Sequence, residues 1–145
     1  MTISLPACRL YYLLFAVVTT GCVRAPSYYV EPQLPREQLA VIKSALVKEG
    51  YQRVLISAID GQALETIEGS IGLAPGMHYL KLFVSSSGLI ILFGEVGLQF
   101  DAQARHVYKI AGTIEYGTAR VWITDENTKQ VIARGTQEIA TTGGH

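Results

Sequence analysis

Short apolar runs separated by turn residues occupy most of the chain from residue 51 onward. Residues 54–59 are rich in β-branched side chains, and the Asp60-Gly61 dipeptide that follows them favours a tight hairpin turn. Residues 80–84 place aliphatic side chains at every second position, which is the pattern of a strand with one buried face. Short strands at regular spacing predict an all-β fold, either a sandwich or a barrel.

Turn residues divide the rest of this region into similar pieces. Strands are predicted at residues 71–73, 98–102, 106–114, 120–124 and 131–134. Gly76 lies in a tight turn at residues 74–77, where it can take a positive φ. The apolar run at 89–93 is predicted to be a buried strand, with a membrane-touching loop as the alternative. The connections leave no room for repeated crossover helices, so a parallel α/β fold is not expected.

Residues 36–49 fit two structures. Leu39, Ile42 and Leu46 have helical spacing, and a proline precedes this segment while Gly50 follows it. The run from 39 to 42 could equally open a sheet. Local spacing mildly favours the helix.

The N-terminal segment has the three parts of a secretory signal. Arg9 supplies positive charge, residues 10–18 form an apolar core of about nine residues, and small residues then lead into Cys22. Spanning a bilayer takes roughly twenty apolar residues, so this core is too short for a transmembrane helix. We therefore predict a signal peptide at residues 1–21.

The sequence around Cys22 resembles the lipobox of bacterial lipoproteins, although Thr19 stands where an apolar residue is usual. This resemblance implies cleavage before Cys22 and attachment of diacylglycerol to its thiol, with the membrane as a partner. Two or three acyl chains would anchor the protein stably, whereas one holds only marginally. Resemblance to enterobacterial lipoproteins implies that Val23, and not an aspartate, behind the cysteine favours the outer membrane, facing the periplasm, over the inner membrane. An uncleaved signal anchor and a soluble secreted protein are the alternatives.

The predicted mature chain has three parts. Residues 22–35 contain three prolines and are predicted to be a lipidated tether, in which Tyr28 and Tyr29 contact lipid, pack on the domain or stay solvated. Residues 36–135 form the β domain, and residues 136–145 form a flexible polar tail.

Charge and cysteine content exclude two classes of protein. Removal of residues 1–21 takes away one of the 12 basic residues, Arg9, and none of the 12 acidic ones. The mature chain therefore has a net charge of −1 and no basic stripe, so no binding to nucleic acid is expected. Of the two cysteines, Cys8 would leave with the signal and Cys22 would carry lipid, so the domain has no disulfide.

The order of several short motifs resembles that of small, mostly uncharacterised lipoproteins of Gram-negative bacteria. The matching pieces are residues 34–40, 59–61, 73–78, 100–102 with Tyr108, and 122–125. The Pro-Gly-x-His turn at residues 75–78 is also similar to turns of PEGA-type and transthyretin-like modules. The resemblance implies a single antiparallel β-sandwich, Ig-like or transthyretin-like, on the cell envelope, with a strand at 39–42 and no inherited catalytic residue.

No catalytic or metal-binding pattern stands out. His78, His106 and His145 lack metal-ligand spacing, and His78 is expected to form a local hydrogen bond after its turn. A triad of Ser57, His78 and Asp60 is conceivable but has no nucleophile elbow. The acidic run 125–127 is predicted to be a hairpin turn rather than a calcium loop.

The expected function follows from the anchor and the sandwich. We expect no enzyme activity, no cofactor and no metal, and a structural or adaptor role with a protein partner in an envelope assembly. The alternative is a glycan- or peptidoglycan-binding module that uses Tyr108, Tyr116 and Trp122 as a stacking platform. Burial of Trp122 against the core is the default expectation for a strand tryptophan.

Overall fold

The computed structural model describes residues 28–43, 52–64, 69–86 and 92–139. The predicted signal peptide, Cys22 and His145 lie outside these residues. Within them a single 3-10 turn, η1 (Arg36–Gln38), precedes β1 (Ala40–Lys43), β2 (Gln52–Ile59), β3 (Gln62–Ala63), β4 (Ser70–Leu73), β5 (Gly76–Ser86), β6 (Phe93–Ala102), β7 (Val107–Glu115), β8 (Thr118–Asp125) and β9 (Val131–Glu138). No helix in these ranges is long and apolar enough to cross a bilayer.

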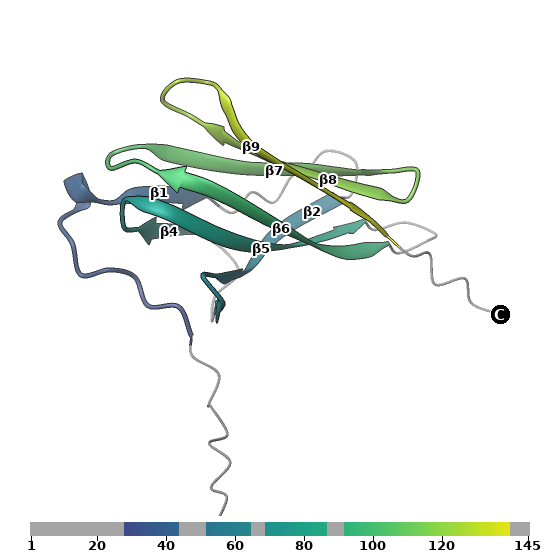
Figure 1. The fold of residues 1–145 in the computed structure, drawn as a ribbon, viewed down its shortest axis with the longest axis horizontal. Helices are drawn as coiled ribbons and strands as arrows, with labels where there is room; N and C mark the ends of the chain where they lie inside the picture. Colours follow the sequence, from purple (N-terminus) through teal and green to yellow (C-terminus); the bar gives the residue numbers. More distant parts are fainter. Residues whose placement is uncertain (1–27, 44–51, 65–68, 87–91, 140–145) are drawn as a thin grey trace, which may run out of the picture.

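The strands form two packed sheets, so the predicted all-β sandwich is confirmed (Figure 1). One sheet has the order β4-β1-β7-β8-β9, and the other has the order β3-β2-β5-β6. Every pairing between named strands is antiparallel except that of β1 with β7. β1 therefore joins the two distant halves of its sheet, the β4 edge and the β7–β8–β9 meander.

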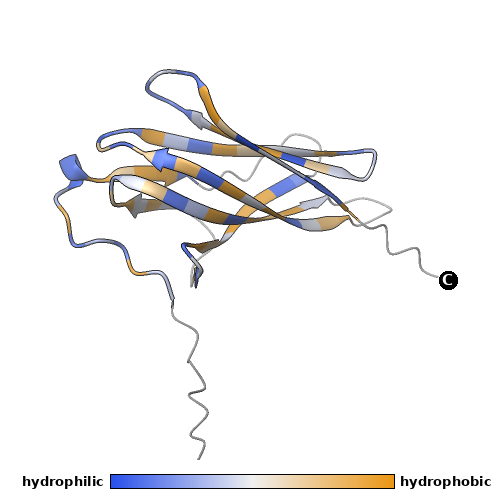
Figure 2. Cartoon of the chain, viewed as in Figure 1, coloured by the Kyte–Doolittle hydropathy of each residue, from blue (hydrophilic) through white to orange (hydrophobic). Residues whose placement is uncertain are grey.

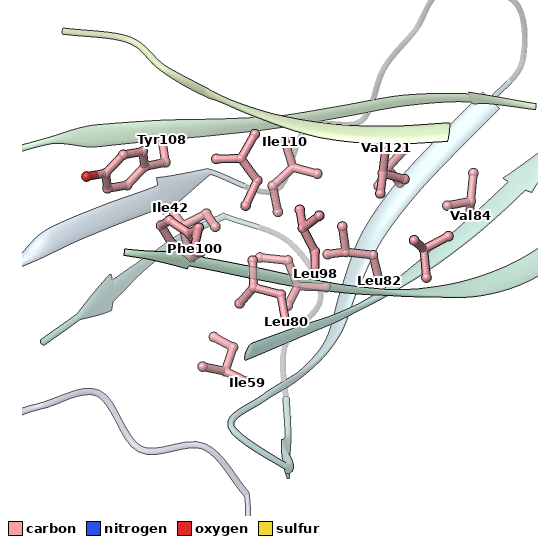
Figure 3. Packing of buried hydrophobic residues seen from close by; sticks show 14 of the residues in the cluster. Ile42, Ile59, Leu80, Leu82, Val84, Leu98, Phe100, Tyr108, Ile110 and Val121 are labelled. Atoms are coloured by element: carbon pink, nitrogen blue, oxygen red, sulfur yellow. The ribbon is translucent and has the colours of Figure 1, made fainter. Parts of the chain in front are cut away.

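The core lies between the sheets and is built by the alternation of side chains along each strand. Apolar and polar residues alternate along β5 and β6 (Figure 2). Leu80, Leu82 and Val84 are fully buried, as the sequence predicted. They meet apolar residues of the facing sheet, including Ile110 and Val121 (Figure 3). Hydrophobic burial supplies the main stabilisation of such a sandwich.

Two hairpins turn through residues with positive φ. Asp60 and Gly61, at +50° and +78°, join β2 to β3, which confirms the predicted tight turn. Tyr116 and Gly117, at +49° and +76°, join β7 to β8 in the same way. Positive φ at both central residues is the signature of a type I′ turn, whose twist matches that of the paired strands.

Of residues 36–49, the described part forms a 3-10 turn followed by β1 at Ala40–Lys43, so a strand is found close to the expected 39–42 and the helical spacing was misleading. β1 is paired on both sides, with β4 and with β7. These partners are distant in sequence, and their hydrogen bonds override the weak local preference for a helix. Residues 44–49 lie outside the described part.

The last strand is longer than the sequence suggested. We expected a flexible tail from residue 136, but β9 continues to Glu138, and Ile139 is only 9% exposed. Gly135 allows this, because a Cβ there would lie 3.0 Å from Val96 on β6. Ile139 in turn packs against Gly94. β9 thus crosses closely over β6 and closes one side of the sandwich (Figure 1).

The run at residues 89–93 is described only at its end. Phe93 begins β6 and is 56% exposed, stacked on Phe83 with ring centroids 6.2 Å apart. Leu92 is partly buried against the core, so of the two described residues only Phe93 departs from the predicted buried strand. Residues 89–91 lie outside the described part.

The segment before η1 lies against the domain, although we expected a tether throughout residues 22–35. Tyr29 donates a backbone hydrogen bond to Ala63 and a hydroxyl hydrogen bond to Gly72 O, both at 2.8 Å. Glu31 accepts a hydrogen bond from Gly72 N at 2.7 Å. Burial, followed by the charges of Asp60 and Glu31, raises the pKa of Tyr29 to about 12, so its hydroxyl keeps the proton that it donates. The segment therefore caps β4, an edge strand that would otherwise expose unpaired backbone groups.

Candidate functional site

A groove lies on the outer face of the five-stranded sheet, over β4, β1 and β7. Its volume is about 390 Å³, within the range of small-molecule sites. Gly72, Val41 and Val107 form the floor and are direct register neighbours on the three strands. Ala40 and Ile42 point the other way, into the core, so the floor residues face outward.

Two arginines and a histidine stand in the walls of this groove. Arg36 comes from η1, and Arg105 and His106 come from the connection between β6 and β7. The remaining wall residues are Glu31, Leu39 and Ser70. Gly72 makes room for two of these wall residues, because a Cβ there would lie 3.2 Å from Leu39 and 3.6 Å from the carboxylate of Glu31.

Arg105 is held in position by its backbone and by its side chain. Its φ is +68°, a left-handed conformation that is uncommon for residues other than glycine. Its amide donates to Leu39 O at 2.8 Å, and its Nε donates to Glu37 O at 3.2 Å. These bonds tie the β6–β7 connection to the segment that carries Arg36.

His106 forms a dyad with Asp125 at the end of β8. The distance from His106 Nδ1 to Asp125 Oδ2 is 2.7 Å, and the Asp125 carboxylate also accepts a hydrogen bond from Asn127 N at 2.8 Å. Burial opposes ionisation of Asp125, but the hydrogen bonds from His106, Asn127 and Thr128 and the charge of His106 outweigh it. The pKa of Asp125 is therefore below its usual range. The dyad fixes the imidazole ring, which stacks on Tyr108 with centroids 6.2 Å apart.

Asp60 and His78 form a second pair at the β2–β3 turn. His78 Nδ1 lies 2.7 Å from Asp60 Oδ2, and its Nε2 lies 2.7 Å from Ala74 O. The predicted local hydrogen bond of His78 is thus confirmed. Ser57 donates to Lys81 O at 2.9 Å instead of to His78, so the conceivable triad is not assembled. Both ring nitrogens of His78 are therefore engaged. Through them His78 on β5 links the β2–β3 turn to the end of β4.

The carboxylates of Asp60 and Asp125 make the stability of the domain depend on pH. Burial raises the pKa of Asp60, but the amide of Tyr79, the hydrogen bond of His78 and its charge outweigh burial and leave the pKa lowered. Asp60 and Asp125 therefore ionise at lower pH in the folded chain than in the unfolded chain, where the pKa is near 3.8. Between the two pKa values the unfolded chain binds more protons, so stability rises with pH.

We expect the stabilisation from Asp60 and Asp125 to be complete above about pH 5 and to be lost as pH falls through the folded pKa values. Denaturant unfolding at pH 6, 4, 3 and 2 measures this loss. The Asp60→Asn, Asp125→Asn double variant should lose less stability between pH 6 and pH 2 than the wild type does. Asp101→Asn, at an exposed position, is the control. An equal loss in the double variant and the wild type would contradict the assignment.

The three aromatic residues proposed as a platform are not brought together. Tyr108 is 1% exposed and lies in the core, edge-on to Phe100. Tyr116 is fully exposed at the β7–β8 turn, and Trp122 is half-buried on β8, paired with Ala111 on β7. Since Tyr108 faces inward and Tyr116 lies at the turn, no common surface presents all three rings.

The acidic run after β8 is a turn, as predicted. Asn127 accepts a hydrogen bond from Val107 N at 3.0 Å, and Glu126 pairs with Lys43 at 3.1 Å. Among the described residues, no group of three or more His, Cys, Asp or Glu side chains could hold a metal ion.

Comparison with known proteins adds no relative. No family model, curated protein or solved structure matches the chain. The likeness to envelope lipoproteins therefore rests on the motifs of the sequence.

The groove residues were not predicted. Arg36 and Arg105 are far apart in sequence and come to line one groove through the pairing of β1 with β7. The pairing of His106 with Asp125 could have been predicted from the Tyr116-Gly117 turn. A two-residue turn there fixes the β7–β8 register and places Asp125 opposite Tyr108, next to His106.

Proposed function

We propose that the protein is a lipid-anchored cell-envelope protein whose β-sandwich is a non-catalytic binding module for an envelope partner. The groove over β4, β1 and β7 carries the binding role, because it combines a defined volume, cationic walls and an apolar floor. Cys22, at the end of the predicted signal peptide, carries the anchor. Val23 supports an outer-membrane location facing the periplasm.

The docked N-terminal segment limits how far the domain can stand from an anchor. Tyr28 bridges to Ala63 on the edge strand β3. The six residues from Cys22 to Ser27 span at most about 21 Å when fully extended. A chain acylated at Cys22 would therefore hold the β3 edge of the domain close to the bilayer.

The polar groups of the groove support binding better than catalysis. His106 is oriented by Asp125, but no hydrogen bond among the described residues joins its ring to a serine or threonine hydroxyl. Nucleophilic catalysis of the triad type needs such a contact. Two arginines that line one groove are instead suited to holding an acidic group.

Photo-cross-linking in the native envelope tests this role. p-Benzoylphenylalanine at Ser70, on the groove rim, should give a discrete adduct with an envelope protein. The same group at Thr136, on the opposite edge strand of the same sheet, is the control and should give little or none. No adduct at Ser70, or equal adducts at both positions, would contradict a partner in the groove.

A pull-down on purified sacculus separates this role from peptidoglycan binding. An adaptor should stay in the supernatant. Specific retention would favour the glycan-binding alternative, although Tyr108, Tyr116 and Trp122 do not form one stacking surface in the fold.

A further inference from the structure

We propose that the groove binds a carboxylate-bearing ligand, such as the free C-terminus of a peptide, through Arg36 and Arg105. This inference rests on the proposed binding role but not on the lipid anchor. Guanidinium groups match carboxylates in shape and charge and form their strongest contacts as paired hydrogen bonds.

Among the described residues, the two arginines have few partners. Neither guanidinium group has a carboxylate within 4.0 Å among the residues described, whereas Lys43, Lys81 and Arg120 each form an ion pair. The Arg105 side chain donates only through its Nε, to Glu37 O. Its terminal nitrogens form no hydrogen bond within the described part of the chain, so they remain for a ligand.

Glu31 lines the same groove and offsets only one of the two arginine charges. Its Oε1 is occupied by Gly72 N at 2.7 Å. With two arginines and one glutamate, the charged side chains of the lining sum to +1 without His106. A net charge of this size suits a single carboxylate better than a phosphate dianion.

The ring of His106 supports the groove and is not counted among its ligand-binding groups. It bonds Asp125 at 2.7 Å and stacks on buried Tyr108, so it lies on the core side of the sheet, away from the outward-facing Val107. The carboxylate of a ligand would therefore meet the two arginines.

The rest of the groove favours an organic acid over an inorganic anion. Leu39, Val41 and Val107 are half-buried aliphatic residues that form one apolar stretch beside the arginines. A short peptide end would place its carboxylate on the arginines and its side chains on this stretch. Such a division between an apolar floor and a few convergent polar groups is typical of ligand sites.

An NMR titration of the full chain in a nonionic detergent tests the proposal. The probes are N-acetyl-alanyl-alanine with a free carboxylate, the same peptide with a C-terminal amide, and inorganic phosphate. We expect the free acid to shift the amide resonances of Val41, Gly72 and Val107, and the amide and phosphate to shift them far less. Equal effects of acid and amide, stronger shifts with phosphate, or no shift with the acid would overturn the proposal.

Substitutions identify the groups responsible. The Arg36→Ala, Arg105→Ala double variant should weaken binding of the acid roughly ten- to a hundred-fold, as expected for losing charge-assisted hydrogen bonds. Arg53→Ala, an exposed arginine on the other sheet, is the matched control and should leave affinity unchanged. Unchanged affinity in the double variant would exclude the arginines as the ligand-binding groups. A failed titration would leave acylation at Cys22 unaffected, so the two proposals fail separately.

Discussion

Replacing Asp125 by alanine should lower the free energy of unfolding by about 3 kcal/mol, because it removes a buried, hydrogen-bonded charge. The side chain is 6% exposed and accepts hydrogen bonds from His106 and Asn127. Without it, the polar hydrogens of both partners lose their acceptor inside the protein. Desolvated groups that lose their partners are costly, whereas surface substitutions usually change stability by less than about 0.5 kcal/mol.

The Asp125→Ala substitution should also weaken ligand binding in the groove. Asn127 donates to Arg105 O at 3.3 Å and accepts from Val107 N at 3.0 Å, so it links the turn after β8 to the groove wall and floor. Loss of Asp125 frees both Asn127 and the ring of His106. We expect poorer binding of any groove ligand in addition to lower stability.

Denaturant unfolding at neutral pH measures the stability loss of Asp125→Ala. Asp101→Ala, at an exposed position on β6, controls for removing one negative charge. Asp125→Asn should lie between the two, since an amide oxygen can accept a hydrogen bond but carries no charge. A loss below about 1 kcal/mol for Asp125→Ala would show that the dyad is not a structural anchor.

The sandwich could be predicted because its strands carry their own signals. Alternation at residues 80–84 and the Asp60-Gly61 turn depend only on neighbours in sequence. The local signal of β1 is ambiguous, and its structure is decided by two distant partners, β4 and β7. The end of β9 depends in the same way on close contact of Gly135 with β6.

The groove was harder to predict, because it arises from non-local contacts. Glu31 and Tyr29 appeared to be tether residues, and only the free edge of β4 at Gly72 explains why they dock. Arg36 and Arg105 are ordinary surface arginines in the sequence, and their common site appears only once β1 lies between β4 and β7. Hydropathy and spacing do not report such juxtapositions.

Replacing Cys22 by alanine should abolish membrane anchoring completely, the largest functional effect that we expect. Each buried methylene contributes about 0.8 kcal/mol, so two acyl chains hold a protein firmly whereas a bare chain has no comparable attachment. The variant should therefore leave the membrane fraction.

Incorporation of radiolabelled palmitate in the native host tests the anchor most directly. The wild type should take up label, and Cys22→Ala should take up none. Cys8→Ala is the matched control and should keep the label, because Cys8 lies within the predicted signal peptide. An unlabelled wild type, or label retained in Cys22→Ala, would contradict the lipid-anchored protein proposed here.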